Sequence, residues 1–366
     1  APFNSFIKIV KQDAETGKTI PYAGAGFKIY DPDGNPVTMT FTYPTPTTID
    51  VFYTNAEGSL VTPEKLSFGK RYSIVEVQAP YGYVLDETPV YFDVTEDNST
   101  EESGVTVVKV DKPNMAQKGT ITVEKTGEVF FGVSVIGSVD ESGNELPAIY
   151  QPQYEKRGLP GAVYEIIAAE DIITPDGTVR NQKGNVVDTV TTDENGTAVS
   201  RELYLGKYEV REIAAPNGMV LNPEPHCVEL VYAGQNVAVT ETATSFENER
   251  QKVEISLVKS IEQNERFGIG NNGEMKNISF GLFAAEEIVS ASGTSIPTDG
   301  LVEIISLNED GTAKIKTDLP FGSYYVQELA TDSHYMLSDT KYPVTFGYAG
   351  QDTVCLLYTS PSPRDR

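Results

Sequence analysis

Three lysines and three glutamates stand at strand positions where a β protein ordinarily places an apolar side chain. In FIKIVK, Lys11 follows Ile7 and Ile9 on one face of a predicted strand, and in YSIVE, Glu76 ends an apolar face in the same way. The pattern recurs in three copies, with Lys11, Lys125 and Lys259 as the lysines and Glu76, Glu212 and Glu328 as the glutamates. A buried amine facing a buried carboxyl group is therefore predicted in each copy.

A third polar side chain follows the first two glutamates at a similar distance. Asn248 in SFENER comes 36 residues after Glu212, and Asp111 in VVKVDKP comes 35 residues after Glu76. This spacing favours Asp111 as the partner in the first copy, with Asn114 as the competing residue.

An amine, a carboxyl group and a side-chain amide or acid enclosed in an apolar core can react with one another. Burial disfavours the charged forms, so the lysine becomes a neutral nucleophile and the glutamic acid a proton donor. The acid can hydrogen-bond the carbonyl of the Asn or Asp side chain and move protons so that ammonia or water leaves. The product is an isopeptide bond, formed once and without turnover. A plain buried salt bridge is the alternative, and it stabilises little because desolvation offsets the attraction.

The matched residues lie in a sequence that repeats three times. Residues 54–85, 192–221 and 307–337 each read as a turn, a strand and a second strand that ends in glutamate, with a lysine strand upstream. Clusters such as DPDGNP and DENGT between these strands indicate hairpin turns, and they lack the later Glu and the helices of a calcium-binding EF-hand. Short strands separated by Gly and Pro turns predict an all-β chain of three tandem β-sandwiches.

The short segments that separate the repeats predict the domain limits. We expect domains at 1–115, 119–249 and 252–354, called the first, second and third repeat below. The second repeat carries an insertion near 133–158, which is predicted to be a surface excursion.

The third repeat is expected to be incomplete. The spacing from Glu328 would place its acceptor at Pro363 or Arg364, neither of which can react, and alternation ends after Leu357. The string CLLYTSPSPRD also matches the translation of a transposase sequencing adapter. Residues 355–366 are therefore interpreted as a cloning or assembly artefact outside the fold, with a genuine irregular tail as the alternative.

The chain resembles the collagen-adhesin B-type domains, also called SpaA-like or prealbumin-like repeats, of Gram-positive surface adhesins and pilins. The resemblance rests on the lysine strands, on EVQAPYGY (76–83) and EIAAPNGM (212–219), and on the final strand ending in Asn or Asp, and it spans all three repeats. The third repeat departs from the family pattern, with ELATDSHYM in place of the Ala-Pro-x-Gly stretch.

The resemblance implies a prealbumin-like (Ig-like) sandwich for each repeat and a crosslinking triad in the first two. The implied triads are Lys11, Glu76 and Asp111, then Lys125, Glu212 and Asn248, while Lys259 and Glu328 lack an acceptor. It also implies that the repeats serve as stalks in an exported parent protein that is anchored to peptidoglycan at the cell-wall surface. We find no pilin-polymerisation lysine motif, which favours an adhesin stalk.

Composition excludes several other classes of protein. A net charge of -25 repels nucleic acid and anionic lipid. Two cysteines and two histidines leave almost no material for a disulfide framework, a metal site or a catalytic triad, so we expect no metal, no other cofactor and no enzyme with turnover. No apolar run approaches the length of a membrane-spanning helix.

The leading hypothesis is a structural stalk segment, and two alternatives stay open. One is a module that binds a host extracellular-matrix protein or a glycan through Tyr150 and Tyr154 of the insertion, although local packing of these tyrosines is favoured. The other is a set of accessory domains of a larger surface enzyme. His226 and Cys227 are adjacent on a strand and face opposite ways, so a buried structural cysteine is expected and not a nucleophile pair.

Overall fold

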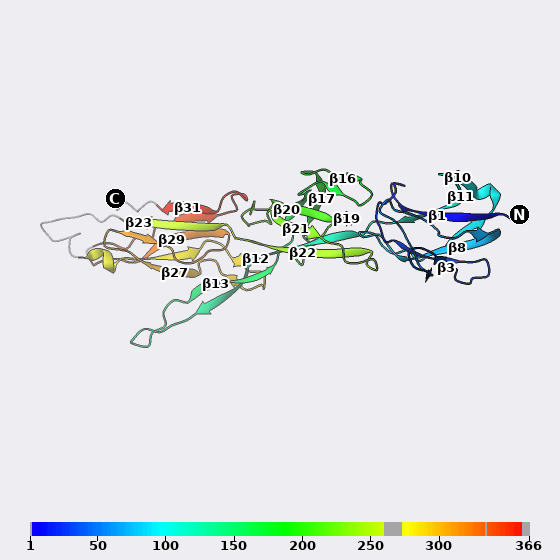
Figure 1. Cartoon of the computed structure of the whole chain (residues 1–366). Coiled ribbons are helices and arrows are strands. Elements are labelled where there is room, and N and C mark those ends of the chain that lie inside the picture. Colours follow the sequence, from blue (N-terminus) through cyan, green and yellow to red (C-terminus); the bar gives the residue numbers. More distant parts are fainter. Residues whose placement is uncertain (1, 260–272, 334, 361–366) are drawn as a thin grey trace.

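Three β-sandwiches follow one another along an elongated molecule (Figure 1). The computed structural model describes residues 2–259, 273–333 and 335–360. Within these ranges the helical segments are two short 3-10 turns, η1 (Glu96–Asn98) and η3 (Glu274–Asn277). Three separate apolar cores lie one in each repeat, which confirms the predicted all-β fold of tandem sandwiches.

The first repeat pairs two sheets around its core. One sheet has the order β10-β11-β1-β6, with β7 beside β1, and the other has the order β5-β2-β8-β9. The strands are β1 (Asn4–Asp13), β2 (Gly26–Tyr30), β3 (Met39–Phe41), β4 (Thr47–Ile49), β5 (Phe52–Tyr53), β6 (Ser59–Val61), β7 (Leu66–Ser67), β8 (Gly69–Gln78), β9 (Val90–Val94), β10 (Ser99–Glu102) and β11 (Val105–Asn114).

The second and third repeats keep this plan. In the second repeat β22, β12 and β18 face the sheet β17-β14-β20-β21, and in the third β28-β23-β31 faces β27-β24-β29-β30. The strands of the second repeat are β12 (Lys118–Ile136), β13 (Ile149–Gly158), β14 (Val163–Ala168), β15 (Ile172–Ile173), β16 (Val179–Asn181), β17 (Val186–Thr191), β18 (Thr197–Val199), β19 (Leu203–Tyr204), β20 (Gly206–Ala214), β21 (His226–Leu230) and β22 (Val239–Asn248). Those of the third are β23 (Lys252–Val258), β24 (Ser279–Ala284), β25 (Ile288–Val289), β26 (Ser295–Ile296), β27 (Leu301–Ser306), β28 (Thr312–Lys314), β29 (Gly322–Ala330), β30 (Tyr342–Phe346) and β31 (Cys355–Ser360).

The first and last strands of each repeat lie side by side and run parallel. β1 pairs with β11, β12 with β22, and β23 with β31. The strand that ends in glutamate belongs to the opposite sheet, because β8 pairs with β2 and β20 with β14. A lysine on the first strand and a residue near the end of the last strand therefore meet a glutamate across the core.

Residues 355–360 form the strand β31, although the sequence placed them outside the fold. β31 pairs with β23 from Lys252↔Cys355 to Leu257↔Ser360. Leu356 and Tyr358 pack against the third core while Leu357 is exposed, so alternation continues past the point where the sequence suggested that it stops. Positions 363 and 364, where spacing placed the third acceptor, lie outside the described residues.

The insertion of the second repeat has no buried residue between 133 and 158, as expected of a surface segment, but it also braces the third repeat. β12 and β13 form a long hairpin that reaches the third repeat (Figure 1). Its outer end pairs with β27 at Ile149↔Leu301. The carbonyl groups of Phe130 and Phe131 accept hydrogen bonds, each of 3.0 Å, from the backbone N–H groups of Ala291 and Ser292. The β13–β27 pairing joins the sheets of the two repeats, and the other two bonds tie β12 to the turn between β25 and β26.

Candidate functional site

The first repeat encloses a lysine, a glutamate and an asparagine that contact one another. Lys11 and Glu76 are fully buried, and Asn114 is almost so. Nζ of Lys11 lies 2.9 Å from Oε1 of Glu76 and donates a hydrogen bond to Oδ1 of Asn114. Nδ2 of Asn114 donates to Oε2 of Glu76 at 2.6 Å and to the carbonyl of Val84 at 2.8 Å. The glutamate therefore bridges the amine and the amide nitrogen.

Asp111 is not part of this cluster, so its choice over Asn114 is wrong. Asp111 pairs with Val10 in the parallel register and points outward, with its carboxylate 3.9 Å from Nζ of Lys109. Its side chain is 44% exposed, whereas Asn114 lies on the inward face. Counting residues from the glutamate gave the outward-facing residue because η1 and β10 lengthen the segment between the glutamate and the last strand of this repeat.

The second repeat contains the predicted cluster. Nζ of Lys125 lies 2.7 Å from Oε2 of Glu212 and donates a hydrogen bond to Oδ1 of Asn248. Nδ2 of Asn248 donates to Oε1 of Glu212 at 2.7 Å and to the carbonyl of Val220 at 2.8 Å. All three side chains are buried, so the same arrangement is built twice.

The hydrogen bonding inside both clusters differs from the expected one. Glutamic acid was expected to donate to the carbonyl of the acceptor, but the amine donates to that oxygen and the glutamate accepts from the amide nitrogen. The carboxylate oxygen that accepts from the amide also accepts a backbone N–H, from Asp86 at Glu76 and from Asn222 at Glu212, both at 3.1 Å. The carboxylate is thereby oriented toward both the amine and the amide nitrogen.

Burial lowers the pKa of both lysines in the two complete clusters. Desolvation brings the pKa of Lys11 down to about 8, although Glu76 opposes the shift. The pKa of Lys125 is lowered for the same reason, against the hydrogen bond and charge of Glu212. The neutral amine of Lys11 is therefore accessible near physiological pH, and neutral amine is the form that attacks a carbonyl carbon.

The clusters differ at one side chain that sequence reasoning did not identify. Tyr164 donates its hydroxyl to Oε2 of Glu212 at 3.1 Å, whereas Phe27 occupies the same register position opposite Glu76. Burial raises the pKa of Tyr164, and Glu212 adds to the effect, so the phenol stays a donor. Comparing the two repeats at this position would have given the signal.

The third repeat keeps the lysine and the glutamate in its core. Nζ of Lys259 lies 3.8 Å from Oε2 of Glu328, and both side chains are buried. Neither oxygen of Glu328 has a hydrogen-bond partner among the described residues.

The tyrosines that suggested a ligand site are packed between repeats. Tyr150 contacts the third core, and the hydroxyl of Tyr154 donates to the carbonyl of Asp318 at 2.9 Å. The guanidinium of Arg250 stacks on Tyr154 with 3.5 Å between its carbon and the ring centroid. Both tyrosines are half-buried and pack against the protein, as favoured, with the third repeat and the linker as their partners.

The cysteine of β21 is exposed, which corrects the expected buried thiol. Cys227 faces solvent, whereas His226 stacks on Phe246 at 3.7 Å between ring centroids. The two side chains do point to opposite faces, as predicted. Across the described ranges, no group of three or more Asp, Glu, His or Cys side chains could hold a metal ion. In the same part of the chain, no helix is long and apolar enough to cross a bilayer.

Comparison with known families identifies the repeats. A model of the SpaA prealbumin-like fold domain matches three times, over residues 5–109, 151–244 and 267–356. The chain belongs to the SpaA prealbumin-like fold domain family. The three SpaA-type matches fall one in each repeat, in agreement with the resemblance noted in the sequence.

One relative is a streptococcal surface protein. The trypsin-resistant surface T6 protein of Streptococcus pyogenes serotype M6 is 27% identical over 147 residues, which are 39% of this chain and 26% of that protein. The chain therefore matches about a quarter of the length of this relative.

Two solved structures align over nearly the whole chain. The Bacillus anthracis TIE protein aligns over 98% of this chain and 50% of its own, with a TM-score of 0.54 and 21% identity, which supports the fold. BcpA, the major pilin subunit of Bacillus cereus, aligns over 98% of this chain and 99% of its own, with a TM-score of 0.33 and 15% identity.

Proposed function

We propose that the chain is a stalk segment of a Gram-positive cell-surface adhesin or pilus-like protein, stapled in its first two repeats by lysine–asparagine isopeptide bonds. The observation that carries the proposal is the buried contact between amine and amide, bridged by one glutamate and built twice. The relatives named above, a surface protein and a pilin, support a location at the cell surface.

The geometry supports a single-turnover reaction in the first repeat. Nζ of Lys11, as the neutral amine, attacks Cγ of Asn114. Glu76 takes a proton from the attacking nitrogen and delivers one to the amide nitrogen, since its oxygens lie 2.9 Å from the amine and 2.6 Å from that nitrogen. The Cγ–Nδ2 bond breaks, ammonia leaves, and the Nζ–Cγ amide remains. Lys125, Glu212 and Asn248 would react in the same way.

The proposed bonds join the first strand of a repeat to its last strand. Lys11 and Asn114 are 103 residues apart, and Lys125 and Asn248 are 123 apart. In the loop-entropy model for disulfides, closing a loop of about 100 residues stabilises a domain by about 4 to 5 kcal/mol, and an amide crosslink should act similarly. A pull on the chain would then bypass most of each sandwich, which is the property that a stalk needs.

The mass of the intact chain tests the proposal. The purified chain should be lighter than its sequence by two molecules of ammonia. Glu212→Gln should restore one of them, and adding Glu76→Gln should restore both, while Glu209→Gln on the same strand β20 should change nothing. An unmodified mass for the folded parent chain would refute the crosslinks.

The same measurement separates the two acceptors in the first repeat. Asn114→Ala should remove one loss of ammonia, whereas Asp111→Ala should leave both. Loss of one water and one ammonia from the parent chain would instead assign the reaction to Asp111.

A further inference from the structure

The second repeat holds a turn of the first repeat through Tyr232 and Gln235. Oε1 of Gln235 accepts a hydrogen bond from the N–H of Ala79 at 2.8 Å, and its backbone carbonyl accepts from the N–H of Leu85 at 2.9 Å. The hydroxyl of Tyr232 donates to the carbonyl of Tyr83 at 2.6 Å. The turn APYGYVL is thus bound at three backbone groups.

A buried glutamine in the linker completes this junction. The N–H of Gln117 donates to the carbonyl of Gly82 at 2.8 Å. Its side chain accepts from the N–H of Ala233 at 2.8 Å and donates to the carbonyls of Gly234 and Val237 at 2.8 and 2.6 Å. All polar atoms of the Gln117 side chain are used, and the side chain ties the linker to the YAGQ segment of the second repeat.

The junction between the second and third repeats is built in the same way. Oε1 of Gln351 accepts from the N–H of Ala215 at 2.8 Å, and its carbonyl accepts from the N–H of Leu221 at 2.9 Å. The hydroxyl of Tyr348 donates to the carbonyl of Met219 at 2.7 Å.

The linker glutamine is repeated there as well. Gln251 is fully buried, and its N–H donates to the carbonyl of Gly218 at 3.0 Å. Its side chain accepts from the N–H of Ala349 at 2.8 Å and donates to the carbonyls of Gly350 and Thr353 at 2.9 and 2.7 Å. The two junctions therefore share one set of contacts.

Two constraints favour glycine in each bound turn: the backbone conformation and the limited space beside the following repeat. Gly82 and Gly218 adopt left-handed φ angles of 91° and 85°. A Cβ added to them would lie 3.0 Å from Pro175 and 3.0 Å from Phe321, which belong to the following repeat. The Ala-Pro-x-Gly turn therefore has the shape that the next repeat requires.

We propose that a glutamine clasp, formed by the linker glutamine and the Tyr-Ala-Gly-Gln segment, recognises the Ala-Pro-x-Gly turn of the preceding repeat and fixes the orientation of successive repeats. The clasp of the first junction is Gln117, Tyr232 and Gln235, and that of the second is Gln251, Tyr348 and Gln351. The partner that this surface fits is a SpaA-type repeat with an Ala-Pro-x-Gly turn. Because the contacts are independent of the lysines, the clasp stands whether or not the crosslinks form.

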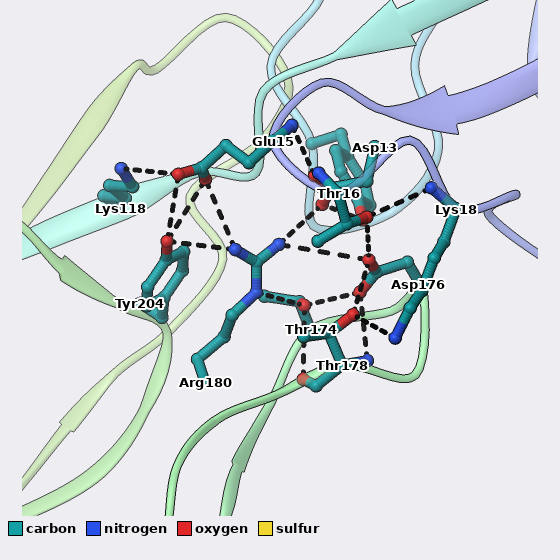
Figure 2. Close-up of polar contacts among 11 residues, drawn as sticks. Asp13, Glu15, Thr16, Lys18, Lys118, Thr174, Asp176, Thr178, Arg180 and Tyr204 are labelled. Atoms are coloured by element: carbon teal, nitrogen blue, oxygen red, sulfur yellow. Dashed lines mark hydrogen bonds and ion pairs between the residues drawn. The ribbon is translucent and has the colours of Figure 1, made fainter.

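An ion-pair network also crosses the first junction, and it is the rival explanation for a fixed orientation. Figure 2 shows Arg180 of the second repeat between Asp13, at 2.9 Å, and Glu15, at 3.6 Å, of the first. At the second junction Gly127 replaces Asp13 in the strand register, and the β12–β13 hairpin makes other contacts. Arg250 of the linker pairs with Asp318 at the second junction, so the ion pairs differ in position and partners, whereas the clasp makes the same contacts at both junctions. We therefore assign the orientation to the clasp.

Distances between spin labels on the full chain test the clasp. In a Cys355→Ser background, one label is placed on the exposed native Cys227 and the other on Lys109→Cys in the first repeat or Ile304→Cys in the third. Both pairs should give narrow distance distributions. The double variant Gln117→Ala/Gln235→Ala should broaden the first distribution and leave the second narrow, and Gln251→Ala/Gln351→Ala should do the reverse.

Two controls make the result decisive. Gln151→Ala, on an exposed residue of the hairpin, should change neither distribution, and Arg180→Ala should leave the first one narrow. Circular dichroism and thermal melting check that each variant keeps its sandwiches. A first distribution that stays narrow without Gln117 and Gln235, or that Arg180→Ala broadens equally, would overturn the clasp as the orienting device.

Discussion

At the scale of single residues, the two clusters differ in the side chain that lies opposite the buried glutamate on the neighbouring strand. Tyr164→Phe should slow crosslinking in the second repeat by about ten- to a hundredfold, because a hydrogen bond to a charged group contributes about 1.5 to 3 kcal/mol. Intact mass followed over time after cell-free synthesis, in a Glu76→Gln background, reports this repeat alone. Tyr208→Phe is the matched control, since its buried hydroxyl donates to the carbonyl of Tyr204 and not to Glu212. Equal rates for both variants would exclude a role for the Tyr164 hydroxyl.

The lowered pKa of Lys11 predicts a pH dependence. Only the neutral amine attacks, so the rate in the first repeat should rise about tenfold per pH unit as pH approaches about 8 and then level off. Time-resolved mass measurements in a Glu212→Gln background check the profile. A rate that stays constant from about pH 6 to about pH 8 would contradict it, as the protonated amine predominates there.

The lowered pKa of Lys11 also makes the free energy of unfolding depend on pH before the bond forms. Between about 8 and the ordinary value of 10.5, the unfolded chain binds a proton at Lys11 that the folded chain does not. The free energy of unfolding of the uncrosslinked first repeat should therefore increase as pH rises through that window.

At the scale of elements, the β12–β13 hairpin braces the third repeat. Replacing residues 132–152 by a two-residue turn removes Val133 and Tyr150 from the surface of the third core. Loss of this apolar burial should lower the free energy of unfolding of the third repeat by about 2 to 4 kcal/mol. Hydrogen exchange read by mass spectrometry resolves the repeats and measures the change.

A shorter deletion provides the control for the brace. Residues 138–146 form the hairpin tip, whose backbone hydrogen bonds are internal, such as Asp140 to Asn144 and Leu146 to Ser138. Replacing the tip alone should leave the third repeat unchanged. If the tip and the full deletion have the same effect, the contacts of Val133 and Tyr150 are not what stabilises the third repeat.

The sequence predicted the elements and most of the two clusters, because strand alternation alone places Lys11 and Glu76 on core faces. It failed where the answer depends on loop length. Counting from Glu76 gave Asp111, whereas the phase of Val108, Val110 and Asn114 on β11 gives the residue that faces inward.

The contacts between repeats could not be predicted from strand alternation or residue spacing. YAGQ occurs in both the second and the third repeat, at 232–235 and 348–351, but its partner is a turn in another repeat. Nothing in the periodicity of one strand indicates which distant backbone groups a glutamine such as Gln235 will bind. The sequence of the hairpin likewise indicates only an insertion, because the strand pattern does not predict its pairing with β27.

At the scale of the whole molecule, the proposed staples predict a distinct mechanical response. Pulled from its ends, the parent chain should show no unfolding step from the first or second repeat. Glu76→Gln/Glu212→Gln should add steps, and freeing the 103 residues between Lys11 and Asn114 should lengthen the chain by about 350 Å. Single-molecule force spectroscopy measures these lengths. Glu209→Gln should behave as the parent, and full-length steps in the parent would contradict the staples.

The parallel pairing of first and last strands also determines how far the molecule can lengthen under load. With both bonds formed, the loaded path passes from Asn114 through a three-residue linker and along β12 to Lys125. That path is already extended, at about 3.3 Å per residue, so it has almost no length left to give. Such a molecule would act as a taut tether and not as a spring, passing a sudden pull along its length without absorbing it.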